Sequence, residues 1–370
     1  KTGRGQIQMI AWLLISFFVL LFLGVPIAMS LGLSAMGGIL FLGGGSTVTI
    51  AQRMFEGMNS FALLAIPLYT FAGFTMSKGG ISKRLMDFCY SIVGHIYGGL
   101  AHVNVLSSMI FAGISGSAVA DTAGVSGMFM PEMIRKGYSK NFTVAVTAIS
   151  STIGIIIPPS IPMVVIAGIC GISTGKLFLG GIIPGVLCGL AQMIVSYFMA
   201  KKEGVPKEPG HFTIGPVLHG LWESWPALLM PIIIVGTITM GIVSPTEAGV
   251  IAVVYGLFAG GIIYRELKWE DIKFAFAETV RTSGRIFIVI GAAKLYTVML
   301  TTAGFDKWVA KTMLGFSTNP TVILIMILLI FFIVTMFMES IATLTLFMPI
   351  LYPIALGVGI DPIVLSVLIT

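Results

Sequence analysis

The run from Leu177 to Ala200 constrains this chain most, because it has no charged residue and is long enough to cross a lipid bilayer. A bilayer core about 30 Å thick needs about 20 helical residues. Hydrophobic residues make up 56% of the chain and charged residues only 10%, whereas soluble domains have about 25% charged residues. The sequence therefore predicts an all-α polytopic membrane protein. The other predicted spans are residues 7–23, 25–42, 61–76, 226–243, 248–264 and 286–303.

The stretch from Gly113 to Pro131 places small residues, hydroxyls and one carboxylate inside an otherwise apolar region. Its apolar flanks, residues 103–112 and 125–134, are each too short to span a bilayer. We therefore interpret residues 101–134 as a re-entrant helical hairpin with a polar tip at Ser115-Gly116-Ser117. Backbone that leaves the helix at membrane depth is tolerated only inside protein or facing water, so this tip is a candidate functional site.

Two further interruptions follow. Residues 142–172 are mostly apolar but contain Gly154 and Pro158-Pro159, and a proline inside a helix removes a backbone hydrogen bond. This pattern predicts a discontinuous helix. Residues 320–358 carry Glu339-Ser340 between two apolar runs, which predicts a second hairpin with a polar tip.

The two hairpins share a pattern. Residues 121–131 read DTAGVSGMFMP and residues 339–349 read ESIATLTLFMP, with a carboxylate before Phe-Met-Pro at one spacing. The shared order predicts a duplication, with a first repeat at 1–200, a linker and interfacial helix at 201–225, and a second repeat at 226–370.

The predicted repeats are inverted. If the predicted spans each cross once, most Lys and Arg residues fall on one side, which the positive-inside rule assigns to the cytoplasm. The two hairpins then open to opposite sides, as in secondary transporters with discontinuous helices at the midplane. The counterpart of Pro158-Pro159 would fall beyond Thr370, so we expect the chain to be truncated at its C-terminus.

The hairpin tips offer oxygen ligands. Hydroxyls and unwound backbone carbonyls suit a hard monovalent cation, and helix N-termini suit an anionic group. The alternative is that these hydroxyls cap helices or bond back to the preceding turn. The hydroxyls concerned are those of Ser115, Ser117, Ser340, Thr343 and Thr345.

Three charged residues, Asp121, Glu339 and Lys294, each have two interpretations, and Glu247 has one. Asp121 and Glu339 either neutralise a cation or carry a proton, as intramembrane carboxylates often do, or they act as helix N-caps. Lys294 contacts substrate or extends its ammonium toward the membrane interface, and Glu247 is expected to cap a helix. The histidines and cysteines show no metal or disulfide spacing, and the basic residues lie in short loops, so no nucleic-acid partner is expected.

The segments GISGSAVAD (113–121), TIGIIIPPS (152–160) and SPTEAG (244–249), with the Phe-Met-Pro hairpin, resemble the large membrane subunit of tripartite ATP-independent periplasmic (TRAP) transporters. The resemblance covers essentially the whole chain. It implies sodium-coupled import of an organic acid across the bacterial inner membrane, delivered by a periplasmic substrate-binding protein. It also implies a small four-helix partner subunit, separate or fused, and an elevator motion of the ion-transporter superfamily type.

The resemblance also implies site residues. One sodium site would join the first tip to the broken helix, and a second would use the second tip with the missing broken helix. The organic acid would lie between the tips. The implied sodium ligands are Ser115, Gly116, Ser117, Gly154, Pro158, Thr343 and Thr345, and the implied substrate contacts are Ser117, Asp121, Thr122, Ser340 and Thr343.

Three other functions compete with this interpretation. A stand-alone ion-coupled carboxylate carrier or antiporter would need no binding protein. An intramembrane protease using Asp121 is disfavoured because no second aspartate lies in a matching context, so no enzyme is expected. A channel is disfavoured because two closed hairpins indicate an occluded site. The sequence does not identify the acid.

Overall fold

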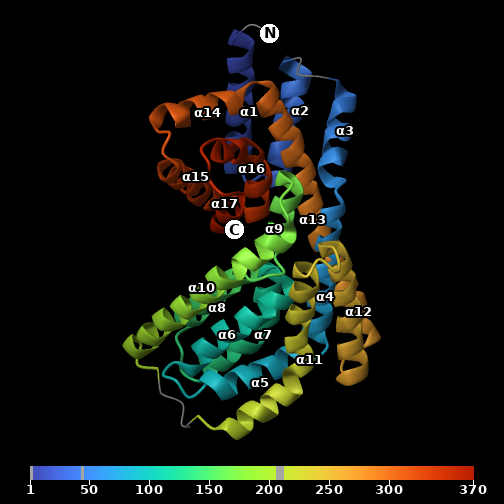
Figure 1. Ribbon diagram of the computed structural model, residues 1–370, viewed down its shortest axis with the longest axis vertical. Helices are drawn as coiled ribbons and strands as arrows, with labels where there is room; N and C mark the ends of the chain where they lie inside the picture. The colour runs from blue at the N-terminus through green and yellow to red at the C-terminus, as the bar shows by residue number, and fades with distance from the viewer. Residues whose placement is uncertain (1–2, 43–45, 206–211) are drawn as a thin grey trace. The chain divides into compact units, whose positions relative to one another are not determined.

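The computed structural model describes residues 3–42, 46–205 and 212–370, and every regular element in these residues is helical (Figure 1). The helices are α1 (Gly3–Phe22), α2 (Ile27–Leu42), α3 (Thr47–Met58), the 3-10 turn η1 (Phe61–Leu64), α4 (Ala65–Lys78), α5 (Ile81–Val93), α6 (Gly99–Ser115), α7 (Ala118–Arg135), α8 (Lys140–Ser151), the 3-10 turn η2 (Thr152–Ile155), α9 (Ile161–Cys170), α10 (Thr174–Lys202), α11 (Ile214–Thr239), α12 (Pro245–Phe258), the π-helical turn η3 (Ala259–Ile263), α13 (Trp269–Thr302), α14 (Phe305–Phe316), α15 (Pro320–Thr335), α16 (Ser340–Gly357) and α17 (Pro362–Ile369).

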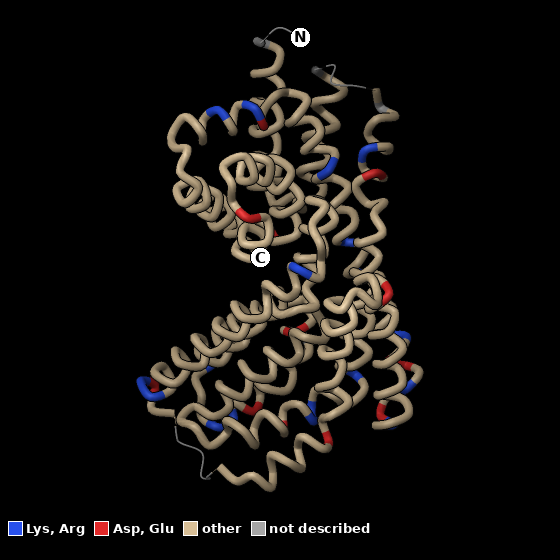
Figure 2. Tube along the Cα trace, viewed as in Figure 1, with Lys and Arg blue, Asp and Glu red and all other residues tan. Residues whose placement is uncertain are grey.

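Seven of the described helices or helix pairs are long and apolar enough to cross a membrane, which agrees with the predicted polytopic class. In α10 no charged side chain lies between Lys176 near its start and Lys201 at its end (Figure 2). Apolar side chains of this helix such as Ile183, 69% exposed, face outward. An apolar outer surface is what contact with lipid requires, because lipid tails replace the protein core as the packing partner.

The contacts divide the chain into two units, each with its own hydrophobic core. Unit 1 consists of Lys1–Leu63, Val164–Ser173 and Ser283–Thr370, and unit 2 of Leu64–Met163 and Thr174–Thr282. These units take segments from both halves of the sequence, so they do not follow the predicted repeats. The repeat boundaries stay a prediction.

The core of unit 1 is fixed by a buried aromatic residue. The Tyr296 hydroxyl on α13 donates a hydrogen bond to the Leu13 carbonyl on α1 at 2.9 Å, and the ring packs against Phe17. In unit 2, α6, α7 and α8 lie side by side (Figure 1), and their core contains Val103, Phe129 and Val146.

The helical parts of both predicted hairpins and of the broken helix are present. α6 and α7 form one pair joined at Gly116, and α15 and α16 form the other, joined at residues 336–339. Between α8 and α9 the helix breaks after Ile155 and resumes at Ile161. That the two hairpins re-enter the membrane from opposite sides stays a prediction.

The helix boundary expected at Pro226 is not observed, because α11 begins at Ile214 and continues through Pro226 and Pro231. Tertiary contacts hold this helix together where local preference disfavours it. The Ser224 hydroxyl donates to the Arg84 carbonyl on α5 at 3.0 Å, and Tyr255 on α12 donates to the Pro226 carbonyl at 2.7 Å. Residues 206–211 of the expected linker lie outside the described residues.

The segment SPTEAG starts α12 with a capping box, which confirms the capping role expected for Glu247. The Glu247 amide donates to Ser244 Oγ at 3.3 Å, and the Ser244 amide donates to Glu247 Oε2 at 2.6 Å. Pro245 occupies the first turn, where its missing N–H costs nothing.

Ser244→Ala is expected to destabilise the protein by about 1 kcal/mol, because α12 loses a side-chain acceptor for one of its free backbone amides. A thermal melt in detergent measures the change. Thr302→Ala is the control, since Thr302 is exposed and bonds only back to the Val298 carbonyl. Equal melting temperatures for the two variants would show that the capping box contributes nothing.

Candidate functional site

The tip of the first hairpin is a tight left-handed turn. α6 ends at Ser115, Gly116 follows at a φ of 62°, and α7 begins at Ala118. Glycine fits here because it adopts positive φ without steric strain. Ser117 is the N-cap of α7, and its hydroxyl oxygen accepts from the Ala120 amide at 3.4 Å.

The break between α8 and α9 is a short non-helical segment that contains the Pro158-Pro159 pair. Ser160 organises its end: the Ser160 hydroxyl donates to the Ile155 carbonyl and accepts from the Met163 amide at 3.3 Å. Pro158, Pro159 and Ser160 are all buried.

The hairpin tip packs directly on this break. The Ile161 amide donates to the Gly116 carbonyl at 3.0 Å. A Cβ added to Gly116 would lie 2.5 Å from the Pro159 carbonyl oxygen, and one added to Gly154 would lie 3.3 Å from the Ser117 carbonyl. Both glycines therefore permit backbone to approach backbone.

The structure thus brings together the residues predicted for one sodium site. Ser115 is fully buried, and its hydroxyl lies 3.5 Å from both the amide and the carbonyl oxygen of Ser117. Gly154 and Pro158 are buried on the opposite side of the contact. The atoms available as cation ligands are hydroxyl and carbonyl oxygens without a formal charge, and such oxygens suit a hard monovalent cation.

Asp121 lies one turn into α7 and is fully buried. It is not an N-cap, because Ser117 has that role. Neither carboxyl oxygen has a hydrogen-bond partner among the described residues, although the hydroxyls of Ser108 on α6 and Ser151 on α8 face it. A buried carboxylate without well-formed hydrogen bonds is costly, so it favours a nearby cation.

A buried polar network between α6 and α8 was not anticipated. Asn104 donates to the Thr147 hydroxyl at 2.9 Å, and the Ser150 hydroxyl donates to the Asn104 side-chain oxygen at 2.9 Å. The signal was available, since small polar residues recur four apart on both helices, at 104 and 108 and at 147 and 151. Helical residues at this spacing share one face.

Thr122, the other predicted substrate contact on α7, is exposed. Its hydroxyl donates to the Ala118 carbonyl at 2.8 Å. This hydrogen bond occupies the hydroxyl proton and leaves only oxygen lone pairs for a ligand.

The tip of the second hairpin is built differently. Glu339 is the N-cap of α16, and its carboxylate accepts from the Ala342 amide at 3.4 Å. The capping alternative therefore describes Glu339, while Asp121 is the fourth residue of its helix. The two carboxylates paired by the repeat are not structurally equivalent.

Of the predicted residues in α16, Thr343 and Thr345 are buried and Ser340 is half-buried. The hydroxyls of Thr343 and Thr345 donate back to the carbonyls of Glu339 and Ile341, at 3.2 and 2.7 Å. Their oxygens can still act as ligands. These residues belong to unit 1 and the first tip to unit 2, and a substrate position between the tips stays a prediction.

Lys294 on α13 is exposed, and its side-chain stem packs against α3. A Cβ added to Gly57 would lie 2.6 Å from the Lys294 Cβ atom. Within the described ranges, no three His, Cys, Asp or Glu side chains gather as a conventional metal site would require.

Comparisons with known proteins match this chain to TRAP transporter permeases. The family described as "Tripartite ATP-independent periplasmic transporter, DctM component" matches residues 14–370. The isethionate TRAP transporter permease protein DctMQ of Oleidesulfovibrio alaskensis is 38% identical over 94% of this chain and 55% of its own length. The sialic acid permease SiaM of Vibrio cholerae is 36% identical over 93% of this chain and 80% of its own length.

The C4-dicarboxylate permease DctM of Pseudomonas aeruginosa is 36% identical over 92% of this chain and 79% of its own length. The chain thus spans about half of the DctMQ relative and about four-fifths of the other two. The family consists of multi-pass membrane permeases of bacterial TRAP systems and not of enzymes. With its helical spans and this match over nearly its full length, the chain belongs to the DctM family of TRAP transporter large permease components.

Proposed function

We propose that this chain forms the sodium-coupled membrane subunit of a TRAP system that imports an organic acid across the bacterial inner membrane. A periplasmic substrate-binding protein delivers the acid, and a small four-helix subunit assembles with the chain. The family is described as tripartite. The name of one relative, DctMQ, combines the letters of the large and the small membrane subunit. The isethionate, sialic acid and C4-dicarboxylate named for the relatives are all organic acids.

The contact between the first hairpin tip and the broken helix carries this proposal. Sodium is bound by oxygens of Ser115, Gly116, Ser117, Gly154 and Pro158, and the backbone approach described above supports this assignment. Because the oxygens proposed to bind sodium are uncharged, one bound sodium adds a positive charge to the tip. That charge attracts the carboxylate of the substrate beside the N-terminus of α7.

The remaining predicted residues complete the scheme. Thr343 and Thr345 bind a second sodium, and the substrate contacts are Ser117, Asp121, Thr122, Ser340 and Thr343. Tip and break belong to one unit, which supports an elevator movement in which they travel together with the bound ion.

Uptake into proteoliposomes tests the proposal. The permease is reconstituted with its small subunit and its cognate binding protein, which is loaded from a panel of organic acids. Uptake is expected only with an inward sodium gradient and with loaded binding protein. Uptake that persists without the binding protein would instead identify a stand-alone carrier or antiporter, and uptake that ignores sodium would refute the coupling.

A further inference from the structure

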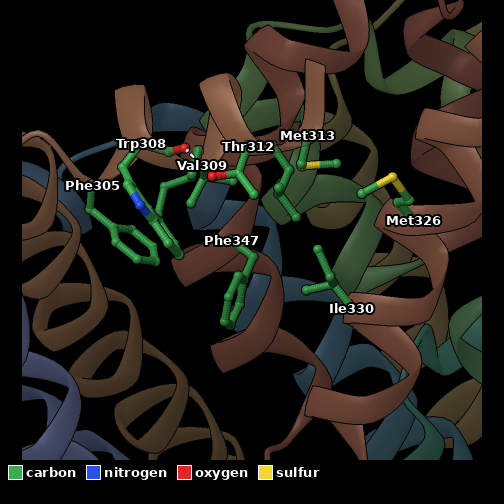
Figure 3. Close-up of a pocket in the computed structure, with 10 residues that line it drawn as sticks. Phe305, Trp308, Val309, Thr312, Met313, Met326, Ile330 and Phe347 are labelled. Carbon is green, nitrogen blue, oxygen red and sulfur yellow. Dashed lines mark hydrogen bonds between the residues drawn. The ribbon is translucent and has the colours of Figure 1, made fainter. Parts of the chain in front are cut away.

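A pocket of about 320 Å³ lies in unit 1 between α14, α15 and α16 (Figure 3). The ten described residues that line it include no charged side chain. Their one hydroxyl, that of Thr312, donates to the Trp308 carbonyl at 2.9 Å, the bond drawn dashed in Figure 3. Such a lining does not specify a ligand. The polar cluster around Asp121 in unit 2 does, because it contains a charge without a counter-ion.

Asp121 is fully buried, and among the described residues no other Asp, Glu, Lys or Arg side chain is buried. Neither of its carboxyl oxygens has a well-formed hydrogen bond to a described residue, and none of the described ion pairs includes it. A buried carboxylate in this state is strongly destabilising. The position therefore calls for a cation that the described side chains do not supply.

Two hydroxyls from neighbouring helices face the Asp121 carboxylate, that of Ser108 on α6 and that of Ser151 on α8. Each can donate its proton away from the carboxylate. Ser108 can donate to the Ser150 hydroxyl at 3.2 Å, and Ser151 can donate to the Thr147 carbonyl at 2.8 Å. When both hydroxyls donate in this way, their oxygen lone pairs are free to turn toward a cation at the carboxylate.

The charge of this cluster matches a monovalent cation. One carboxylate with neutral hydroxyls balances a single positive charge, whereas calcium sites usually contain several carboxylates. No group of three His, Cys, Asp or Glu side chains is found in the part of the chain that the structure describes. Carboxylate and hydroxyl oxygens are suitable ligands for sodium. A cluster occupied by sodium is neutral, so it does not repel a second sodium at the hairpin tip.

We propose that Asp121, Ser108 and Ser151 bind a sodium ion between α6, α7 and α8, in addition to the ion at the hairpin tip. This inference rests on the proposed sodium coupling and adds a site to it. Ser108 precedes Ser115 by seven residues on α6, so the two sites lie about 10 Å apart along the helix axis. The added ion also allows Asp121 to contact an organic acid, because two bare carboxylates repel each other.

Thermal melts of the purified permease complex, with N-methylglucamine replacing sodium at constant ionic strength, test the site. Ser108→Ala combined with Ser151→Ala is expected to raise the sodium concentration for half-maximal stabilisation about tenfold, because two ligand oxygens are lost. In proteoliposomes the same variant is expected to show a lower Hill coefficient for sodium, since one coupled site is lost. Ser107→Ala is the control, because Ser107 is the neighbouring buried serine on α6 and does not face Asp121.

The outcomes separate this site from the proposed function. If uptake by the unmodified permease ignores sodium, the proposed coupling fails and this site fails with it. If the unmodified permease needs sodium and the double variant responds to sodium as Ser107→Ala does, only the site at Asp121 is overturned. An unchanged sodium response together with a melting temperature that depends on pH only when Asp121 is present would assign a proton to this position and would also overturn it.

A measurement on the unmodified complex keeps the proposal testable if the double variant fails to fold. A cryo-EM map recorded in sodium is expected to contain a density peak that touches the Asp121 carboxylate and both hydroxyls. The peak is expected to disappear when N-methylglucamine replaces sodium. A map in sodium without this peak, or a peak that is unchanged in N-methylglucamine, would refute the site.

Discussion

Gly116→Ala is expected to reduce sodium-dependent uptake at least tenfold, while Gly127→Ala leaves it unchanged. Gly116 has a φ of 62°, and a Cβ there would lie 2.5 Å from the Pro159 carbonyl oxygen. An L-residue in the left-handed region costs about 1–2 kcal/mol, and the contact with backbone can be relieved only by moving the tip away from the break. Either change separates the oxygens proposed to bind sodium.

Two glycines separate the causes. Gly127 lies in α7 of the same hairpin with no atom within 4 Å of an added Cβ, so alanine there tests for nonspecific effects. Gly171 has a φ of 68°, and no atom lies within 4 Å of an added Cβ. Gly171→Ala therefore introduces the strain of a positive φ without a steric clash.

Uptake and the shift in melting temperature on adding sodium are measured for all three variants. Gly171→Ala is expected to melt earlier but to keep its response to sodium, and Gly116→Ala is expected to lose that response. A Gly116→Ala permease that transports normally would show that the tip-to-break contact is not the sodium site.

The elements of this fold that could be predicted from the sequence are those with strong local signals. Apolar length predicted the spans, and Gly154 with Pro158-Pro159 predicted the break that separates α8 from α9. The polar tip between two short apolar flanks predicted the α6–α7 pair. In each case a physical limit, either bilayer thickness or a missing backbone donor, permits few alternatives.

The helix boundaries that failed depend on tertiary contacts. Pro226 predicts a helix start when it is considered alone, but α11 runs through it because α5 contacts the helix at Ser224 and α12 contacts it at the Pro226 carbonyl. Sequence alone does not reveal which backbone carbonyl a distant Tyr255 will bond.

In the candidate site, too, the residues were predictable from local sequence, whereas their contacts depend on tertiary structure. The tip residues were predicted from their composition, but the approach of Gly116 to Pro159 is a contact between segments far apart in the chain. The repeat suggested equal roles for Asp121 and Glu339, yet α7 begins three residues before its carboxylate and α16 begins one residue after its own. Shared sequence spacing did not preserve the helix start.

Asp121→Asn is expected to raise the melting temperature and to lower sodium-stimulated uptake at least tenfold. The two hydroxyls that face Asp121 each have a second acceptor within reach: Ser108 can donate to Ser150 at 3.2 Å, and Ser151 to the Thr147 carbonyl at 2.8 Å. In this arrangement neither carboxyl oxygen receives a well-formed hydrogen bond, and a buried charge without one is costly.

An asparagine side chain is uncharged and adds two N–H donors at this position. It removes a buried charge and lets its N–H groups donate to Ser108 and Ser151, which is expected to stabilise the protein by about 1–3 kcal/mol. If the charge attracts the coupling cation or organises the substrate site, the same substitution weakens sodium-dependent uptake. Stability and transport are thus expected to change in opposite directions, an effect that damage to the fold cannot produce.

Glu132→Gln on the same helix is the matched control, because Glu132 makes an ion pair with the exposed Arg135. Surface pairs contribute about 0–1 kcal/mol, so neither melting temperature nor uptake is expected to change appreciably. Two results for Asp121→Asn would contradict the argument. A lower melting temperature would show that the carboxylate is well satisfied where it lies, and undiminished uptake would show that its charge has no part in coupling. Only greater stability combined with weaker sodium dependence would show that the Asp121 carboxylate destabilises the fold and contributes to sodium coupling.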